Sequence, residues 1–401
     1  MKTAGIIAEY NPFHLGHAGH IEKTRLALGA DCAVVCVMSG NYVQRGDIAV
    51  FNKHARAETA VRCGADLVLE LPAPYALSSA AKFASAGVYI LDSLGVCDYI
   101  SFGSESGDVA ALADAASKIV SGEAETFIKA WLDRGLPYAA AQQKAADAVM
   151  GPRSEIFKSP NNLLGIEYLK AVSLYKSSLQ PMTVKRTGGA HDGDAGYSAS
   201  ALRKALYRLE AQWEAVPDAA AGVYMEEISA GRGPVSVKSC EIAVLSRLRA
   251  IGDFSMLPGA SEGLDRRFLR YAATEPTVAE LLDKVKTKRY AMSRLRRMLM
   301  CACLGITDAD TLEPPPYIRV LALNRTGISL LKTARVTAKL PIITKPASAQ
   351  KLPGRAAEMF YKEAAATDFY VLAYPDEKNR AGGQEWRKSP RVVEGIMNYE
   401  L

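Results

Sequence analysis

The chain of 401 residues is longer than one hydrophobic core usually serves, so its length predicts two domains. Apolar residues make up 49% of the chain and charged residues 23%, which is typical of a globular protein and excludes a disordered or fibrous one. The chain contains no run of about 20 apolar residues, and the apolar run that ends at Glu9 is too short for a signal peptide. We therefore expect a cytoplasmic protein with no membrane partner.

Strands and helices are predicted to alternate near the N-terminus. Apolar or β-branched runs of strand length lie at residues 4–8, 32–38, 67–71 and 99–102. Patterns compatible with helices lie between them, at residues 18–28, 53–63 and 79–94. Near-continuous apolar strands separated by helices predict a Rossmann-like α/β domain with a parallel sheet that is covered on both faces. In such a sheet the ligand binds at the carboxyl ends of the strands.

Two histidines lie where the first predicted strand passes into the first predicted helix, in the sequence Glu-Tyr-Asn-Pro-Phe-His-Leu-Gly-His at residues 9–17. His14 and His17 would project from one face of the helix, beside backbone N–H groups that have no partner within it. These N–H groups and the helix dipole favour phosphate oxygens as ligands. Gly16 has no β-carbon, so a nucleotide can lie close to the backbone there. Imidazoles that donate hydrogen bonds to an α-phosphate would stabilise the charge that develops during nucleotidyl transfer.

Chance spacing and metal binding account less well for the histidine pair. The same spacing arises by chance among surface or core histidines. Zinc is disfavoured because no third ligand lies near the pair, and His20 and His54 show no ligand-like grouping.

The seven cysteines form no Cys-x-x-Cys pair, so we expect buried thiols in a reducing compartment and no metal site. The absence of Gly-x-Gly-x-x-Gly after the first strand, and of a Gly-Lys-Ser/Thr loop, counts against a dinucleotide dehydrogenase and a P-loop NTPase.

Three further residues are candidates for contact with the nucleotide, each with a structural alternative. Gly103 follows a predicted strand and would let the backbone approach adenine or ribose, or would be an ordinary strand-to-loop glycine. Asn162 would hydrogen-bond the nucleotide or cap the helix that begins beside it. Arg186 follows a predicted strand at residues 182–185 and would neutralise triphosphate charge, or would form a solvated surface pair with Lys185.

The positive charge of the chain lies in its C-terminal part. Residues 1–150 hold 12 Lys and Arg and 16 Asp and Glu, a net charge of −4. Because the whole chain has a net charge of +6, residues 151–401 carry a net charge of +10. Residues 284–297 and 314–357 contain many basic and no acidic side chains, whereas an inert helix would mix the two signs. Apolar residues recur at helical spacing between the arginines, so we expect an amphipathic helix with one basic face. A solvated helix face is the alternative to the polyanion that we favour, RNA. The residues predicted to bind it are Lys286, Lys288, Arg289, Arg294, Arg296 and Arg297.

Several blocks of sequence resemble the nucleotidyltransferase superfamily and, more narrowly, the bacterial tRNA(Met) cytidine acetate ligase family. The blocks are residues 5–17, Met-Ser-Gly-Asn-Tyr-Val-Gln-Arg-Gly at 38–46, Ser-Phe-Gly-Ser-Glu at 101–105, residues 159–168, and Lys185-Arg186. The resemblance implies that His14 and His17 are catalytic. It also implies an ATP site that is made by Ile7, Ala8, Glu9, Tyr10, Asn11, Pro12, Phe13, His14, Leu15, Gly16, His17, His20, Gly103, Asn162 and Arg186.

A later segment, Ser-Ala-Ser-Ala-Leu-Arg at residues 198–203, is similar to the second signature of nucleotidyltransferases, a Ser/Thr-rich helix start followed by Arg that helps to hold the β- and γ-phosphates. Ser198 and Ser200 would bind phosphate on that basis, or one of them would simply cap the helix. The sequence of this segment departs from the Ile-Ser-Ser-Thr that is usual in the superfamily.

The resemblance implies a reaction and a domain plan. ATP, with Mg²⁺ carried by its phosphates, would activate acetate as acetyl-adenylate, and the acetyl group would pass to the wobble cytidine of elongator tRNA(Met). We expect a nucleotidyltransferase domain at residues 1–205 and a mainly helical, basic tRNA-binding domain at residues 206–401. The alternatives are a nucleotidyltransferase that makes a cofactor, which the long basic half disfavours, and a tRNA-binding protein without catalysis, which the intact histidine pair disfavours.

Overall fold

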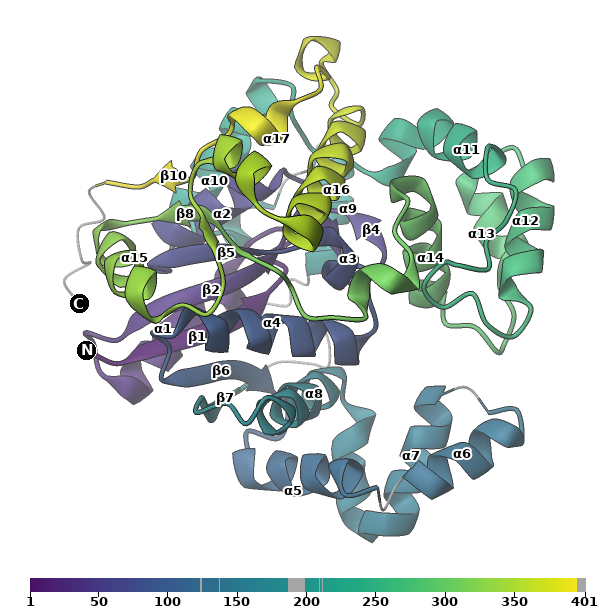
Figure 1. Cartoon of the computed structure of the whole chain (residues 1–401), viewed down its shortest axis with the longest axis horizontal. Coiled ribbons are helices and arrows are strands. Elements are labelled where there is room, and N and C mark those ends of the chain that lie inside the picture. The colour runs from purple at the N-terminus through teal and green to yellow at the C-terminus, as the bar shows by residue number, and fades with distance from the viewer. Residues whose placement is uncertain (123–124, 137, 187–198, 209, 211, 395–401) are drawn as a thin grey trace.

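A twisted, mainly parallel sheet lies at the centre of the molecule (Figure 1). The computed structural model describes residues 1–394 except 123–124, 137, 187–198, 209 and 211. The strand order is β10-β8-β5-β2-β1-β6-β7, and β9 pairs with β8. The strands are β1 (Thr3–Ala8), β2 (Ala33–Ser39), β5 (Leu67–Leu71), β6 (Tyr99–Ser104), β7 (Gln180–Lys185), β8 (Ile318–Leu323), β9 (Ile342–Ile343) and β10 (Arg391–Val392). The predicted strands near the N-terminus and the predicted α/β class are thereby confirmed.

The order of the strands reverses beside β1, which pairs in parallel with β2 on one side and with β6 on the other. Loops that follow these three strands therefore meet at one edge of the sheet, where an open α/β sheet binds its ligand. A short hairpin, β3 (Tyr42–Val43) and β4 (Asp47–Ile48), follows β2 directly and stands at this edge.

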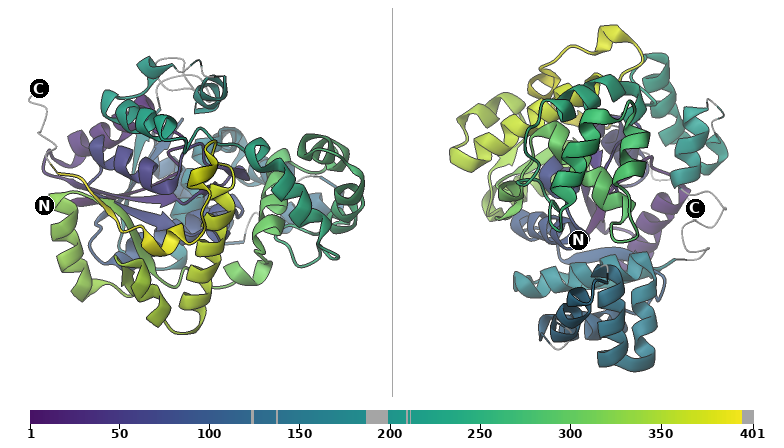
Figure 2. Two further views of the ribbon diagram at one scale, coloured as in Figure 1. Left: turned by 90° about the horizontal axis from the view of Figure 1, so that it is seen from above. Right: turned by 90° about the vertical axis from the view of Figure 1, so that its right-hand side faces the viewer.

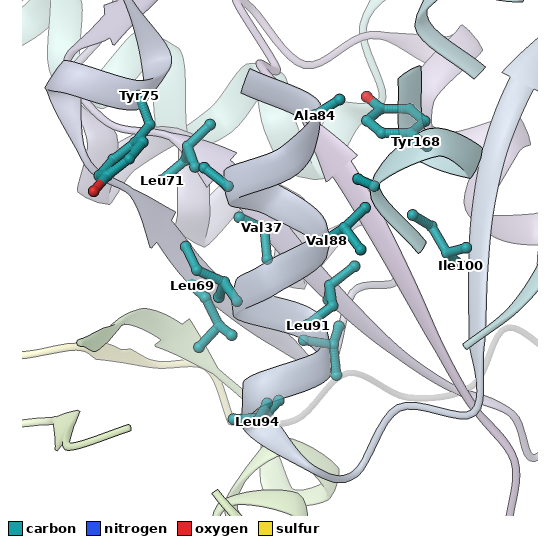
Figure 3. Close-up of a cluster of buried hydrophobic side chains, with 14 of the residues drawn as sticks. Val37, Leu69, Leu71, Tyr75, Ala84, Val88, Leu91, Leu94, Ile100 and Tyr168 are labelled. Carbon is teal, nitrogen blue, oxygen red and sulfur yellow. The ribbon is translucent and has the colours of Figure 1, made fainter. Parts of the chain in front are cut away.

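Helices cover both faces of the sheet (Figure 2). Alternate residues of β2 point to opposite faces, so that Val35 and Val37 pack with one set of helices while Cys36 and Met38 pack with another. Figure 3 shows α4 (Ala80–Leu94) on the first face, with Val88 and other apolar side chains directed at the strands.

The other helices are α1 (Leu15–Leu28), α2 (Lys53–Arg62), α3 (Ala73–Ala76), α5 (Val109–Val120), α6 (Glu125–Asp133), α7 (Tyr138–Met150), α8 (Pro160–Leu174), α9 (Ala199–Tyr207), α10 (Asp218–Ser229), α11 (Glu241–Arg249), α12 (Leu264–Thr274), α13 (Val278–Val285), α14 (Met292–Leu304), α15 (Arg325–Thr337), α16 (Gly354–Val371) and α17 (Gln384–Arg387). Short 3₁₀ helices are η1 (Gly151–Lys158), η2 (Trp213–Ala215), η3 (Val237–Cys240), η4 (Asp308–Thr311), η5 (Pro346–Lys351) and η6 (Glu377–Asn379). Helices α11–α14 form a lobe to one side of the sheet, and α5–α7 form a second lobe below it (Figure 1).

The sheet does not follow the expected division of the chain after residue 205. Strand β8 pairs antiparallel with β5, and every residue of β8 is buried. The sheet therefore takes strands from both sides of residue 205, while helices α11–α14 of the second half lie in a lobe beside it (Figure 1). Without β8, the fully buried strand β5 would present an unpaired edge, which is unfavourable.

A cluster of buried ionic side chains joins the two halves of the chain. Lys53 on α2 contacts Glu70 on β5 at 2.6 Å and Glu385 on α17 at 2.8 Å, and all three side chains are almost fully buried. Arg319 on β8 lies 2.9 Å from Glu385. Burial and the charge of Glu70 raise the pKa of the nearby Glu363 well above its ordinary value. Arg319 was expected within a basic surface at residues 314–357; its burial in this cluster corrects that expectation.

Within the described part of the chain, no helix is both long enough and apolar enough to span a bilayer.

Candidate nucleotide-binding site

The turn from β1 into α1 holds the two histidines in a defined orientation and tautomer. His14 is the N-cap of α1, and its Nδ1 accepts a hydrogen bond from the Gly16 backbone N–H at 3.1 Å. The Nδ1 of His17 accepts one from the backbone N–H of His14 at 3.2 Å. The two rings stack with centroids 3.8 Å apart. Because each Nδ1 accepts, a neutral ring carries its proton on Nε2, which is left as a donor.

The rings are neutral because they are buried near cations. Burial lowers the pKa of His14 to about 4, helped by the positive charges of Arg186 and Arg203. Burial likewise lowers the pKa of His20 to about 4 and that of His17 well below its ordinary value. Three neutral imidazoles therefore lie at the start of α1 at neutral pH, and two of them present Nε2–H groups suited to phosphate oxygens.

We expect the fold to lose stability as the pH falls from about 6.5 to about 4. In this window the unfolded chain binds protons at its histidines while the folded chain does not, so acid favours unfolding. Urea unfolding of wild type and of His20→Asn at pH 7 and pH 5 measures the effect. The stability difference between the two pH values should be smaller in His20→Asn; an equal difference in both proteins would contradict the assignment.

Contacts of Tyr10, Phe13 and Asn11 hold the histidine turn in place. The ring of Tyr10 meets that of His17 edge-on at a centroid distance of 4.9 Å, and the hydroxyl of Tyr10 lies 3.3 Å from the Sγ of Cys36 on β2. The backbone N–H of Phe13 donates to the hydroxyl of Tyr224 on α10 at 2.9 Å. The Oδ1 of Asn11 accepts from the Val50 N–H at 2.8 Å. The turn is thus tied both to the sheet and to a helix far away in the sequence.

Arg56 on α2 is a buried support that the sequence did not indicate. Its guanidinium donates to four backbone carbonyls, those of Phe51 at 2.9 Å, Glu9 at 2.5 Å, Ser39 at 3.1 Å and Gly40. Glu9 follows β1, Ser39 and Gly40 lie at the end of β2, and Phe51 lies between β4 and α2. Arg56 therefore holds together the two loops that form the edge of the site. No sequence motif could reveal a cation whose partners are carbonyls.

On the β6 side of the turn, the structure brings Gly103 and Arg186 together. A β-carbon on Gly103 would lie 3.3 Å from the Cγ of Arg186, so the space above this glycine is filled by the arginine side chain. Packing against Arg186 therefore explains why residue 103 is a glycine, and the sequence analysis did not predict this contact. His20 bonds to Ser101 on β6 at 3.0 Å, which ties α1 to the same strand.

Asn162 does not cap its own helix. Helix α8 begins at Pro160, and the Oδ1 of Asn162 accepts the backbone N–H groups of Glu105 at 3.0 Å and Ser106 at 3.1 Å. The Glu105 carboxylate in turn accepts the backbone N–H of Asn162 at 2.9 Å. The capping alternative is therefore wrong, because the cap comes from the loop after β6. Asn162 holds that loop in place.

The remaining predicted ATP-site residues fall into three groups. Ala8, Glu9, Asn11, Pro12 and Gly16 lie in or beside the turn. Ile7 packs against Gly87 of α4, and Leu15 is exposed at the start of α1. Ser200 accepts a hydrogen bond from Arg203 at 3.0 Å, while Ser198 lies outside the described residues.

A cavity of about 420 Å³ opens beside His17 on the β2 side of the turn. Its lining residues carry two carboxylates and three guanidinium groups, and they are Glu9, Tyr10, Asn11, His17, Val43, Arg45, Asp47, Ala199, Ser200, Arg203 and Arg296. A larger cleft of about 800 Å³ lies between the β6 loop and α5, but its charged lining residues Glu105, Asp108, Asp114 and Glu155 are all acidic. Phosphate groups are repelled by carboxylates, so the cavity beside His17 suits a triphosphate better.

The basic residues on and before α14 have several different environments. Arg294 donates to the Gly259 carbonyl at 2.9 Å and pairs with Glu262 at 3.2 Å. Arg297 donates to the Gln44 carbonyl at 3.2 Å, and Lys286 to the carbonyl of Tyr290. Glu262 also lies 3.7 Å from Arg289. The compensating acid that the local sequence lacks therefore comes from residues far along the chain.

Arg296, one of the residues predicted to bind RNA, lines the cavity beside His17. Lys288 and Arg289 are exposed, outside the cavity. Exposed cations remain suited to the polyanion that the sequence analysis expects.

The hairpin β3–β4 fits against α14 because of Gly46. Its φ of +79° is one that side chains rarely adopt, and a β-carbon there would lie 2.3 Å from the backbone nitrogen of Arg297. We expect Gly46→Ala to lower the unfolding free energy by about 1–3 kcal/mol, because both strain and overlap oppose it. Urea unfolding measures the loss. Gly222→Ala, on α10 with nothing within 4 Å, is the control and should lose no stability.

Comparison with known proteins agrees with this geometry. Residues 1–385 match the model of the HIGH Nucleotidyl Transferase family. The chain is 38% identical, over 97% of its length and 99% of the relative, to the tRNA(Met) cytidine acetate ligase of Acetivibrio thermocellus. It is 39% identical, over 86% of its length and 87% of the relative, to that of Caldicellulosiruptor saccharolyticus.

A solved structure agrees as well. The crystal structure of Thermotoga maritima TmcAL bound with alpha-thio ATP superposes with a TM-score of 0.91 at 32% identity, over 98% of this chain and all of that one. Both the expected nucleotidyltransferase fold and the resemblance drawn from the sequence are confirmed. The chain belongs to the tRNA(Met) cytidine acetate ligase family of HIGH nucleotidyl transferases.

Proposed function

We propose that the protein is an ATP-dependent tRNA(Met) cytidine acetate ligase. In the first step the acetate carboxylate attacks the α-phosphate of ATP, which gives acetyl-adenylate and pyrophosphate. In the second step the exocyclic amine of the wobble cytidine of elongator tRNA(Met) takes the acetyl group, and AMP leaves. The observation that carries the proposal is the pair of stacked imidazoles, His14 and His17, each with Nδ1 occupied and Nε2 free to donate.

The first step gains from these donors. Two neutral Nε2–H groups facing an α-phosphate stabilise the negative charge that develops on its oxygens, without the repulsion between two like-charged rings. We assign Gly103 and Asn162 to the adenosine side of the site, along β6, Arg186 to the charge of the triphosphate, and Ser200 and Arg203 to the β- and γ-phosphates. Mg²⁺ would be carried by the phosphate oxygens and would neutralise the charge of the leaving pyrophosphate; the described residues contain no group of three His, Cys, Asp or Glu side chains able to hold a metal ion.

The lobe α11–α14 is the part of the chain best suited to tRNA. Residues 235–305 contain thirteen Lys and Arg and seven Asp and Glu, a net charge of +6 that equals the charge of the whole chain. Both Arg267 and Arg270 lie over the ring of Tyr271, at 5.3 and 5.4 Å from its centroid. Clustered cations on one small lobe attract the phosphate backbone of a nucleic acid.

One assay separates this function from its rivals. ATP–pyrophosphate exchange that depends on acetate supports the ligase, and mass spectrometry of tRNA nucleosides then identifies acetylated cytidine as the product. Exchange that depends on a small phosphorylated acceptor would support the cofactor-making nucleotidyltransferase. Tight tRNA binding with no exchange would support the binding protein without catalysis.

We expect the double variant Lys288→Glu and Arg289→Glu to bind tRNA at least about tenfold more weakly and to keep acetate-dependent exchange. Both side chains are exposed and lie outside the cavity beside His17. Titration of tRNA at several salt concentrations measures the effect, and the salt dependence should become shallower by about one unit for each lost phosphate contact. Loss of exchange with unchanged tRNA affinity would contradict the assignment of the lobe.

A further inference from the structure

The cavity beside His17 has two walls of different origin. One wall comes from α9, with Ser200 and Arg203, and the other from the hairpin β3–β4, with Arg45 and Asp47. Arg296 of α14 also lines the cavity. We call Ser200 and Arg203 the α9 wall, and Arg45 and Asp47 the hairpin wall. The proposed function uses only the α9 wall, so the charged groups of the hairpin wall are unassigned.

The hairpin wall is rigidly held. The backbone N–H of Gln44 donates to the Glu9 carboxylate at 2.7 Å, and the Gln44 carbonyl accepts from Arg297 at 3.2 Å. The hydroxyl of Tyr42 donates to the Ala366 carbonyl at 2.7 Å. The hairpin is thus bound to the nucleotide turn, to α14 and to α16. A loop held on three sides can place a catalytic group precisely.

The geometry of the first step leaves the hairpin wall for the acceptor. In a displacement at phosphorus the attacking and leaving oxygens lie roughly in line, on opposite sides of the phosphate. Pyrophosphate leaves toward Ser200 and Arg203 in the proposed function, so acetate enters from the other side. The Arg45 and Arg296 guanidinium groups suit that carboxylate. The cytidine amine then has to reach the acetyl carbon from the same side.

The charges of the hairpin wall also match the edge of cytosine. Cytosine presents an amino donor at N4 beside acceptors at N3 and O2, and a carboxylate is the usual partner of N4. Asp47 of this wall supplies a carboxylate, and Arg45 of this wall and Arg296 of α14 supply donors. Once pyrophosphate has left, this cavity has room for an extruded base, which an enzyme acting on a base takes into a pocket.

We propose that the hairpin wall receives the target cytosine and that Asp47 is a catalytic residue that accepts a proton from its N4 amine. This inference rests on the proposed function. The N4 lone pair forms a bond to the carbonyl carbon of acetyl-adenylate, and the bond from that carbon to the phosphate oxygen breaks. AMP departs with the electron pair, and the N4 proton passes to an oxygen of Asp47, which returns it to water.

The surroundings of Asp47 agree with this role. Its Oδ1 accepts the Ile48 backbone N–H at 2.9 Å, which fixes the carboxylate. Burial raises the pKa of Asp47, while that hydrogen bond and the charges of Arg296 and Arg203 limit the rise. The titratable groups facing it from other elements are Tyr207 of α9 and Cys240 of η3. The pKa of each is raised by burial, so both remain neutral at neutral pH and Asp47 titrates below them.

The test bypasses the first step. Chemically prepared acetyl-adenylate and tRNA(Met) are mixed with wild type, Asp47→Asn or Asp47→Glu, and the acetylated cytidine is quantified by mass spectrometry. Asp47→Asn retains an oxygen for the Ile48 N–H, so the hairpin should stay in place. We expect its transfer rate to fall at least about 10²-fold at saturating tRNA, and by a much larger factor than its acetate-dependent exchange. Asp47→Glu should recover part of the rate.

A pH profile separates proton transfer from binding. The transfer rate of wild type should fall as acid protonates Asp47, and Asp47→Asn should lack that dependence. Unchanged transfer in Asp47→Asn, a loss confined to tRNA affinity, or an equal loss of exchange would each overturn the inference. Unfolding of Asp47→Asn in urea checks its fold, and Asp47→Ser replaces it if that variant is unstable. A wild type without acetate-dependent exchange would instead refute the proposed function itself.

Discussion

Replacing His17 with alanine is expected to reduce acetate-dependent ATP–pyrophosphate exchange by at least about 10²–10³-fold, the usual effect of removing one donor to a developing oxyanion. The His17 imidazole stacks on His14 and is fixed through its Nδ1, so its Nε2–H points in one direction. The loss should appear in kcat, because the hydrogen bond strengthens as charge develops on the phosphate. Exchange of labelled pyrophosphate into ATP measures it.

The controls for His17 separate catalysis from folding and from tRNA binding. His17→Gln keeps an N–H donor on a side chain and should retain more exchange than His17→Ala. The tRNA affinity of both variants should equal that of wild type, because the basic lobe α11–α14 is unchanged. Near-normal exchange in His17→Ala would refute the role of the imidazole pair, and with it the proposed first step.

The largest effect on stability is expected for Lys53→Met. Lys53 is 1% exposed and contacts both Glu70 and Glu385, so its removal leaves two buried carboxylates that share the cation Arg319. Breaking such a buried pair from one side typically costs about 3–5 kcal/mol. Urea unfolding at neutral pH, monitored by circular dichroism, measures the loss of unfolding free energy.

An exposed lysine is the matched control. Lys82 on α4 lies 3.7 Å from Asp308, and both side chains are largely exposed, so Lys82→Met should change the unfolding free energy by less than about 1 kcal/mol. Adding Glu385→Gln to Lys53→Met should restore part of the lost stability, because it removes one of the uncompensated charges. If Lys53→Met and Lys82→Met lower the unfolding free energy by similar amounts, the buried cluster does not stabilise the fold more than an exposed ion pair does.

Local patterns were sufficient to predict the nucleotide-binding half of the fold. The apolar runs at β1, β2, β5 and β6 are short and near-continuous, and the helices between them follow in order, so each element is specified by its own residues. The same boundary placed the histidine pair at the opening of the first helix, although α1 begins at Leu15 and not at the predicted residue 18. Long-range partners were not needed to place these elements.

The limits of local patterns appear at Arg319 and Asn162. Arg319 lies in a stretch without acidic residues, but its partners Glu70 and Glu385 come from other elements of the fold. Asn162 stands at a helix start, where capping is common, yet Glu105 from the loop after β6 supplies the helix cap. In both cases the partner is distant in sequence, so neither composition nor spacing could identify it.

The sequence by itself determined the class of sheet, the histidine turn and the excess of basic residues toward the C-terminus, because each depends on residues close together in the chain. Only the tertiary structure decided that β8 completes the sheet, that Arg56 binds four carbonyls, and that Gly46 brings the hairpin wall against α14. The physical reason is that pairing across a sheet, burial of charge and close backbone contact depend on which distant segments meet, and this is settled by packing of the whole chain.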